Sequence, residues 1–243
     1  MTKTVLITGA SRGIGREVAR LAAMRGWTVG INYQQDEGAA RQTLQRVEEA
    51  GGTGMIIQAD VAQEAGVLRL FDTFEDAFGP LSGLVNNAGI VAESLPLARM
   101  SAERLHRMFE TNVYGAFLCA REAARRLSSG GAIVNVSSIA ARLGSPNEYI
   151  DYAASKAAVD TLTLGLAKEL GPAGIRVNAV RPGVTLTDIH ASGGQPGRAE
   201  RLGATTPLGR AAEPVEIAAG IVWLLSDEAS YTTGALLDIG GGR

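Results

Sequence analysis

The chain has 243 residues and a formal net charge of −2, with 46% hydrophobic and 20% charged residues. This composition supplies enough apolar side chains for a packed core, and the length suits one α/β domain. The nearly balanced charge gives no basic patch for nucleic acid or for an anionic membrane surface. We therefore expect a globular protein with neither nucleic acid nor a membrane as its partner.

The single cysteine and the first residues indicate a compartment. Cys119 lies in an apolar stretch and has no second cysteine to pair with, which is typical of a reducing cytoplasm. An apolar run begins within a few residues of Met1, so we expect no signal peptide. No apolar run reaches the roughly 20 residues that cross a bilayer. These features predict a cytoplasmic protein.

Short β-rich runs alternate with helical patterns along the whole chain. Several of the runs lack polar alternation, as expected for parallel strands that helices cover on both faces. The pattern predicts an α/β fold, a Rossmann-type doubly wound parallel sheet of about seven strands, in a single domain spanning residues 1–243. The expected strands cover residues 4–8, 28–33, 54–58, 84–86, 132–137, 175–180 and 236–239, and the expected helices cover residues 14–25, 38–50, 63–78, 101–127, 152–170 and 214–226.

A glycine-rich turn follows the first strand, with the sequence TGASRGIG at residues 8–15. Gly9 permits a tight turn, Gly13 lets the main chain approach a diphosphate, and Gly15 lets the next helix pack closely. The amino end of that helix offers unpaired N–H groups and a partial positive charge to phosphates. A strand, a glycine turn and a helix in this order predict a nucleotide-binding site.

Tyr152 and Lys156 are four residues apart, so on a helix they project from the same face. We expect the ammonium to favour phenolate and to lower the pKa of the tyrosine, which would let it exchange a proton near neutral pH. Tyr149 has Ala153 at the matching position and gains no cation. The pair and the glycine turn together indicate a redox enzyme.

The stretch at residues 190–210 is rich in Gly, Pro and Arg and shows no periodic pattern. A segment of this length in a compact domain is typical of a lid or a mobile binding segment, with surface decoration as the alternative. We expect a substrate lid around residues 188–210.

Seven motifs in a fixed order carry a family resemblance over essentially the whole chain. The sequence resembles the classical short-chain dehydrogenases/reductases, particularly the bacterial 3-oxoacyl-[acyl-carrier-protein] reductase and glucose-dehydrogenase-like branches. The motifs are TGASRGIG at 8–15, Asp60-Val61, Asn86-Asn87-Ala88-Gly89, Asn112, IVNVSS at 133–138, Tyr152 with Lys156, and Pro182-Gly183.

The resemblance implies four catalytic positions: Ser138, Tyr152, Lys156 and Asn112. Ser138 ends a predicted strand at the edge where open α/β sheets bind ligands, and it would stabilise charge developing on a carbonyl oxygen. Tyr152 would deliver the proton, and Lys156 would also bind the nicotinamide ribose. Asn112 would hold a water linked to Lys156; the alternative is a helix-interior amide satisfied by the main chain. Ser137 points the opposite way from Ser138 on an alternating strand.

The end of the second strand predicts the cofactor. Enzymes that select NAD usually carry an acidic residue there, whereas this strand ends in Asn32-Tyr33 and the first carboxylate is Asp36. A 2′-phosphate would not be repelled, and Arg12 is expected to pair with it, the alternative being a solvated surface charge. We therefore expect NADP(H) rather than NAD.

The family implies further contacts with the cofactor. Asp60 and Val61 would flank the adenine, and the main chain at Val184 and the hydroxyl of Thr187 would bind the carboxamide. The full expected set is Gly9, Ser11, Arg12, Gly13, Ile14, Gly15, Asn32, Tyr33, Asp60, Val61, Asn86, Ala88, Gly89, Tyr152, Lys156, Pro182, Gly183, Val184 and Thr187.

These expectations favour an NADP(H)-dependent oxidoreductase that interconverts a small carbonyl and a secondary alcohol. The alternatives are a 3-oxoacyl-[acyl-carrier-protein] reductase specifically, or a nucleotide-binding regulator without turnover. Carrier-protein reductases need basic residues near the site mouth. This chain has none at 128–129 or 171–173, although Arg125 and Arg126 lie one turn before the first of these places.

Two further expectations concern metals and assembly. His106 and His190 are the only histidines and have no partner at metal-ligand spacing, so we expect no metal site. The resemblance implies a homo-oligomer, a tetramer, that packs through the helices at residues 101–127 and 152–170.

Overall fold

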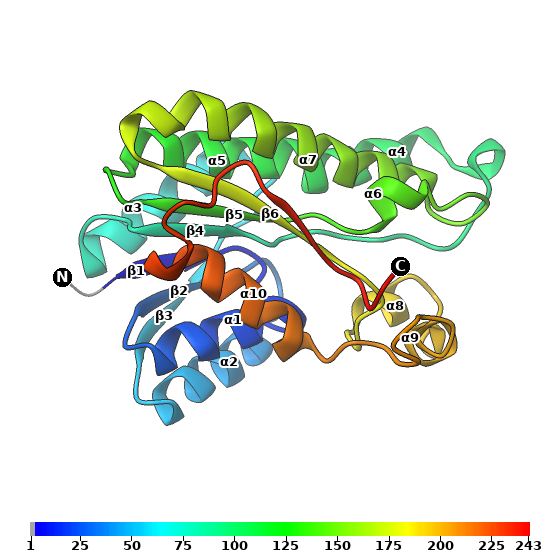
Figure 1. The fold of residues 1–243 in the computed structure, drawn as a ribbon, viewed down its shortest axis with the longest axis horizontal. Helices are drawn as coiled ribbons and strands as arrows, with labels where there is room; N and C mark the ends of the chain where they lie inside the picture. The colour runs from blue at the N-terminus through cyan, green and yellow to red at the C-terminus, as the bar shows by residue number, and fades with distance from the viewer. Residues whose placement is uncertain (1–2) are drawn as a thin grey trace.

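The computed structural model describes residues 3–243, with the side chains of His190 and Ser192 outside the described set. Seven parallel strands form one sheet in the order β3-β2-β1-β4-β5-β6-β7 (Figure 1). The predicted doubly wound α/β fold and its number of strands are therefore confirmed. The strands are β1 (Thr4–Ile7), β2 (Thr28–Tyr33), β3 (Thr53–Gln58), β4 (Gly83–Asn86), β5 (Ala132–Val136), β6 (Arg176–Pro182) and β7 (Leu236–Ile239).

Helices cover both faces of the sheet, which is why its strands read as unbroken apolar runs. Successive side chains of β1 point to opposite faces. Val5 belongs to the core under the first layer together with Val18, and Leu6 to the core under the second layer together with Phe71. The first layer holds α1 (Gly13–Met24), α2 (Glu37–Glu49) and α10 (Pro214–Leu225), and the second holds α3 (Glu64–Phe78), α5 (Gly115–Arg126) and α7 (Ile150–Leu170) (Figure 1).

The helix expected over residues 101–127 is interrupted. It runs as α4 (Ala102–Phe109), a π-helical turn (Glu110–Tyr114) and then α5. A π turn widens a helix locally and is frequent at functional sites. Here it carries Asn112, whose amide bonds the main chain of Ile90, so a polar contact outside the helix accounts for the irregularity.

Short helical turns absent from the sequence expectation occupy several connections. They have too few residues for a 3.6-residue period to appear in the sequence. They are the 3-10 turns Leu97–Arg99, Gly171–Ala173 and Asp227–Ala229 and the short helices α6 (Ala140–Leu143), α8 (Ile189–Ser192) and α9 (Arg198–Gly203).

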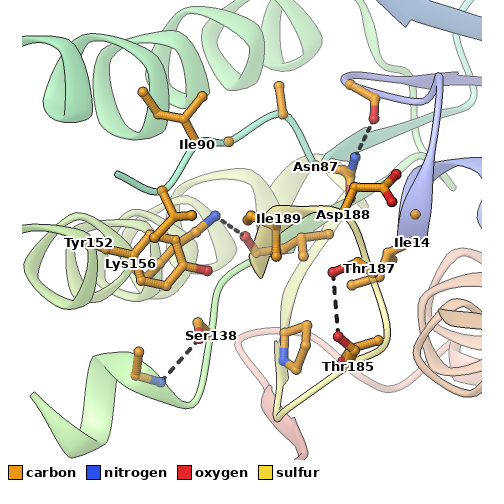
Figure 2. A pocket seen from close by; sticks show the side chains of 18 of the residues that line it. Ile14, Asn87, Ile90, Ser138, Tyr152, Lys156, Thr185, Thr187, Asp188 and Ile189 are labelled. Carbon is orange, nitrogen blue, oxygen red and sulfur yellow. Dashed lines mark hydrogen bonds between the residues drawn. The ribbon is translucent and has the colours of Figure 1, made fainter. Parts of the chain in front are cut away.

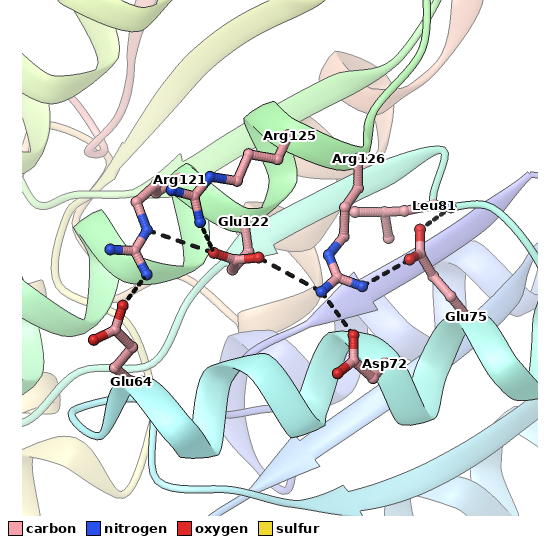
Figure 3. A network of polar contacts seen from close by, with 8 residues as sticks. All are labelled: Glu64, Asp72, Glu75, Leu81, Arg121, Glu122, Arg125 and Arg126. Carbon is pink, nitrogen blue, oxygen red and sulfur yellow. Dashed lines mark hydrogen bonds and ion pairs between the residues drawn. The ribbon is translucent and has the colours of Figure 1, made fainter.

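A network of ion pairs ties the end of α5 to α3 (Figure 3). The buried carboxylate of Glu122 lies 2.8 Å from Arg125 and 3.5 Å from both Arg121 and Arg126. Arg126 also bonds Asp72 at 2.7 Å, with Glu75 and Glu64 completing the links to α3. The positive charges in this last turn of α5 therefore pair with carboxylates.

The strand order reverses between β1 and β4, and open α/β sheets bind ligands outside the carboxyl ends of the strands at such a point. The turn after β1 and the residues after β5 lie at this edge. Because α5 runs back against the strands, its last residue, Arg126, lies at the opposite edge. Within residues 3–243, no helix is both long enough and apolar enough to cross a membrane.

Candidate active site

A cavity of about 870 Å³ opens at the carboxyl edge of the strands. Figure 2 shows Tyr152, Lys156 and Ser138 on one side of it and Asn87, Ile14 and Thr187 on the other. Most of the residues expected from the sequence line this cavity, while Gly15, Asn86 and Asn112 do not. Those that line it are Gly9, Ser11, Arg12, Gly13, Ile14, Asn32, Tyr33, Asp60, Val61, Ala88, Gly89, Ser138, Tyr152, Lys156, Pro182, Gly183, Val184 and Thr187.

The glycine turn leaves the main chain open to the cavity. Gly9 and Gly13 have φ angles of +61° and +56°, a region that side chains disfavour. A Cβ on Gly9 would lie 2.8 Å from the Cα of Ala88, so the turn and the loop after β4 need this glycine to pack. A Cβ on Gly15 would lie 2.7 Å from the amide nitrogen of Asn87, which makes Gly15 a packing residue behind the cavity.

Two asparagines hold the glycine turn in place. The Gly9 N–H donates to Oδ1 of Asn32 at 3.1 Å, and Nδ2 of Asn32 donates to the carbonyl of Ala59 at 3.0 Å. Asn32 was expected to bind the cofactor, but its buried amide is used within the protein. Asn87, absent from the expected set, donates to the carbonyls of Thr8 and Gly9 at 2.8 and 2.9 Å. The motif after β4, which includes Asn87, was the sequence feature that could have identified this residue.

Asn86 and Asn112 also act inside the protein rather than in the cavity. Asn86 donates to the carbonyl of Ala116 at 2.8 Å and joins β4 to α5. Asn112 accepts from the Ile90 N–H at 2.7 Å and donates to the Ile90 carbonyl at 2.9 Å. A Cβ on Gly89 would lie 3.3 Å from both Oδ1 of Asn112 and Nζ of Lys156, so these two atoms converge on one point.

Arg12 of the glycine turn is an exposed cation that lines the cavity. Arg12 is exposed, and its guanidinium makes no hydrogen bond or ion pair with any residue that the structure describes. Tyr33 and Asp36 line the same region. The Asp36 carboxylate caps α2 by accepting from the Ala39 N–H at 2.8 Å. The cavity therefore offers a guanidinium here, with a carboxylate engaged by a helix end beside it.

The Tyr152 side chain lies next to Ser138, whose Oγ accepts from the Ala140 N–H at 3.1 Å. Burial raises the pKa of Tyr152 above its usual value near 10, and the hydrogen bond with Ser138 opposes that rise. The phenol is therefore protonated at neutral pH. This differs from the expectation that a neighbouring ammonium lowers the pKa of this tyrosine.

The Lys156 ammonium is held by the main chain of β5. Its Nζ donates to the carbonyl of Val136 at 2.8 Å and lies 5.7 Å from the ring centroid of Tyr152. Burial lowers the pKa of Lys156 to about 8, and Asp160 opposes this shift. Ser137 donates to the main-chain carbonyl of Lys156 at 3.0 Å, which anchors β5 to α7.

The segment at 188–210, expected to be irregular, contains α8 and α9 and contacts the start of α7. Arg198 bonds Glu148 at 2.7 Å, and its guanidinium carbon lies 4.9 Å from the ring centroid of Tyr149. Gln195 donates to the Tyr149 hydroxyl at 3.2 Å. Tyr149, for which sequence reasoning found no partner, is a contact of this segment.

Thr187 lies where this segment leaves β6. Its hydroxyl donates to the carbonyl of Thr185 at 3.5 Å, and its methyl carbon would lie 3.3 Å from a Cβ on Gly13. The methyl group therefore packs over the glycine turn. Asp188 and Ile189, at the start of the expected lid, extend the lining of the cavity from here.

The residues present fit a nicotinamide dinucleotide. The main chain around Gly9 and Gly13 forms a cradle that a Cβ would fill, and a helix amino end follows it. Asp60 and Val61 line the cavity on one side of that cradle, and Tyr152 lies beyond it. Among the side chains described in residues 3–243, no three His, Cys, Asp or Glu groups are arranged to hold a metal ion.

Comparison with known proteins identifies the family. The family model described as enoyl-(acyl carrier protein) reductase matches residues 9–243. The Escherichia coli (strain K12) protein named uncharacterized oxidoreductase YgfF is 51% identical over 98% of both chains. A 3beta-hydroxysteroid dehydrogenase 1 from Eggerthella lenta is 42% identical over 99% of this chain and 93% of that one.

A solved structure agrees with these relatives. A short chain dehydrogenase from Burkholderia cenocepacia J2315 in complex with NADP matches with a TM-score of 0.91 and 34% identity, over 99% of this chain and 97% of that chain. The chain belongs to the classical short-chain dehydrogenase/reductase family, and it is an oxidoreductase.

Proposed function

We propose that this oxidoreductase uses NADP(H) to interconvert a carbonyl and a secondary alcohol, with Tyr152 as the general acid and base. The observation that carries the proposal is one cavity with Tyr152, Ser138 and Lys156 at one end and the glycine turn at the other. A regulator without turnover has no need of a protonated phenol beside a serine hydroxyl and a buried ammonium.

Each of the three side chains has a distinct task. A bound nicotinamide dinucleotide supplies or accepts the hydride. Ser138 donates a hydrogen bond to the carbonyl oxygen, where negative charge develops during reduction. Tyr152 donates its phenolic proton to that oxygen, and its raised pKa keeps the proton available at neutral pH. Lys156 supplies a positive charge and N–H donors next to the reacting groups.

Two residues support a preference for NADPH over NADH. Arg12 is exposed at the cavity with its guanidinium unpaired among the described residues, so it is available to a 2′-phosphate. Tyr33 stands at the end of β2, where an acidic residue would repel that phosphate. The NADP bound to the related Burkholderia cenocepacia enzyme supports the same preference.

The substrate side of the cavity supports a free carbonyl or alcohol with an apolar body. Its wall includes Ile90, Leu143, Ile189 and Leu202. One relative is named for a hydroxysteroid, and a hydroxysteroid is a free secondary alcohol with an apolar body. We propose a free compound of this kind as the substrate.

A carrier-bound acyl group is the second candidate, and the family model's description favours it. The two arginines that lie one turn before residues 128–129 do not support it. Arg125 and Arg126 pair with Glu122, and Arg126 also pairs with Asp72 and Glu75. They lie at the edge of the sheet opposite the cavity.

The same proposal covers the lid and the assembly. Residues 188–210 would close over the substrate, because Arg198 and Gln195 reach the start of α7. A homo-oligomer, a tetramer, would bury the apolar side chains that α4, α5 and α7 leave exposed. These include Phe109, Phe117 and Leu164, which are exposed by 40%, 46% and 40%.

The test is NADPH oxidation at 340 nm by the purified protein against a panel of ketones, aldehydes, sugars and acyl thioesters. We expect turnover with free apolar ketones, and turnover at least about 10²-fold slower in the Tyr152→Phe variant. A protein that binds NADPH but turns over no member of the panel would contradict the proposal.

A further inference from the structure

A buried carboxylate lies one helical turn beyond Lys156. Asp160 is four residues further along α7, so both side chains project from the same side of the helix. Asp160 is only 6% exposed. Its Oδ2 lies 3.0 Å from Nε and 2.8 Å from Nη2 of Arg181, while its Oδ1 is buried without a hydrogen-bond partner among the described residues.

Arg181 shares its charge with a second carboxylate. Its Nη1 lies 3.4 Å from Asp238 of β7, and Asp238 also pairs with Arg142 of α6. The chain of charges therefore runs from the interior at Asp160 to the surface at Arg142, which is 55% exposed. Arg181 therefore competes with Lys156 for the charge of Asp160, whose Oδ1 has no hydrogen-bond partner among the described residues.

The buried ammonium of Lys156 requires a nearby negative charge to be stable. Lys156 is 4% exposed, and among the described residues its Nζ donates one hydrogen bond, to the Val136 carbonyl. An ammonium removed from water is strongly disfavoured unless an anion lies near it, because charges interact strongly in a medium of low permittivity. A single carbonyl oxygen does not replace the water that the ammonium has lost.

The groups that face Lys156 identify the source of that charge. From its own helix these are the neutral phenol of Tyr152 and the carboxylate of Asp160. From the neighbouring elements they are the Val136 carbonyl of β5 and the neutral amide of Asn112 in the π-helical turn. Within the described part of the chain, Asp160 is the charged group that opposes the lowering of the Lys156 pKa.

We propose that Asp160 is a positioning residue for Lys156. The Asp160 carboxylate stabilises the buried Lys156 ammonium, and Arg181 weakens this effect because it pairs with the same carboxylate. The proposal rests on the proposed function, in which Lys156 acts as a cation beside the reacting groups. It adds a residue that touches neither substrate nor cofactor and acts through another side chain.

The first experiment measures two pH profiles, one for kcat/KM in carbonyl reduction and one for the dissociation constant of NADPH. In Asp160→Asn the basic limb of both profiles should move to lower pH by at least about half a unit, since a nearby opposite charge typically shifts a pKa by one unit or more. In Arg181→Gln the limb should move to higher pH, because the competing cation is gone.

Asp151→Asn is the matched control. Asp151 is on the same helix, its side chain is fully buried, and it pairs with Arg104 at 2.8 Å. Its loss should leave both limbs in place even where it lowers the rate. A role of Asp160 in folding alone would lower kcat/KM equally at every pH. An unmoved limb in Asp160→Asn, or an equal shift in Asp151→Asn, would overturn the proposal.

A second experiment needs neither cofactor nor turnover, so it separates this proposal from the proposed function. Urea unfolding midpoints are measured for wild type, Asp160→Asn, Lys156→Met and the double variant. At pH 7, loss of Asp160 should lower the midpoint more when Lys156 is present than when Met replaces it. At about pH 10 the loss of Asp160 should have the same effect with Lys156 or with Met, because the pKa of Lys156 is about 8 and its amine is then neutral.

Additive midpoints at pH 7 would contradict the proposal whatever the enzyme's activity. If Asp160→Asn does not fold, Arg181→Gln decides between the outcomes. An upward shift of its basic limb supports the proposal, and an unchanged limb contradicts it.

Discussion

Arg198 of the proposed lid lies over the ring of Tyr149, with its guanidinium carbon 4.9 Å from the ring centroid. Tyr149 is three residues before Tyr152 in the sequence. The same guanidinium bonds Glu148 at 2.7 Å. The lid is therefore fastened to the residues that lead into the helix carrying the acid/base pair. The proposed lid and the start of that helix are linked through these contacts.

This contact predicts how lid variants behave. Arg198→Ala loses both the ion pair and the cation–π contact, so we expect KM for the carbonyl substrate to rise by about 5- to 30-fold, on the order of 1–2 kcal/mol, with kcat nearly unchanged. Tyr149→Phe keeps the ring and loses one neutral hydrogen bond, so its effect should stay within about 10-fold. Steady-state kinetics of both variants make the comparison. A Tyr149→Phe defect larger than that of Arg198→Ala would show that the hydroxyl does more than hold the lid.

Cofactor preference should depend on Arg12 and Tyr33. Arg12→Ala is expected to weaken NADPH binding by about 10- to 100-fold, the usual effect of losing a charge-assisted hydrogen bond, and to leave NADH unchanged. Tyr33→Asp should shift the preference towards NADH by repelling the 2′-phosphate and accepting from the ribose hydroxyls. Titrations of both cofactors by fluorescence measure the two effects. A wild-type protein that binds NADH more tightly than NADPH would contradict this account.

The pH dependence of reduction follows from Lys156. Burial lowers its pKa to about 8, so the ammonium is present below that pH and is lost above it. Tyr152 has a raised pKa and stays protonated through the same range. We expect kcat/KM for carbonyl reduction to be level near pH 7 and to fall as the pH rises through about 8. A profile that stays level up to pH 10 would show that the charge of Lys156 is not needed.

The ion-pair network between α3 and α5 should contribute to stability and not to turnover. Glu122 is buried beside Arg121, Arg125 and Arg126, so Glu122→Gln leaves cations without their shared partner. We expect a loss of about 1–3 kcal/mol in the free energy of unfolding by urea, with kcat unchanged. Asp72→Asn, which removes an exposed member of the network, should cost less than about 1 kcal/mol. Equal losses in the two variants would show that burial of Glu122 is unimportant.

The paired arginines also predict a preference between thioesters. Arg125 and Arg126 are neutralised by carboxylates and lie at the far edge of the sheet, so they offer no docking patch for an acidic carrier. We expect kcat/KM for a 3-oxoacyl group to be similar on carrier protein and on a small thiol, with little dependence on salt. A large advantage for the carrier that disappears with added salt would reveal a patch elsewhere on the surface.

Local patterns were sufficient to predict the strands, the glycine turn and the helix of Tyr152, because each depends on residues close together in the sequence. The sequence could not show that Asn32 and Asn112 are used inside the protein, since their partners Ala59 and Ile90 are brought to them by the fold. The expected lowering of the Tyr152 pKa was wrong because the fold buries the phenol, and burial depends on segments distant in the sequence. The spacing placed Lys156 and Tyr152 on one face, but the Val136 carbonyl, from another strand, sets where the ammonium lies.

The central claim is that Tyr152 donates the proton in carbonyl reduction. The most direct measurement is the single-turnover rate of NADPH oxidation in wild type and Tyr152→Phe, with the dissociation constant of NADPH determined for both. We expect the variant to bind NADPH within about 3-fold of wild type and to reduce the carbonyl at least about 10²- to 10⁴-fold more slowly, as is usual when a general acid is lost. A variant that binds NADPH normally and keeps a rate close to wild type would contradict the claim.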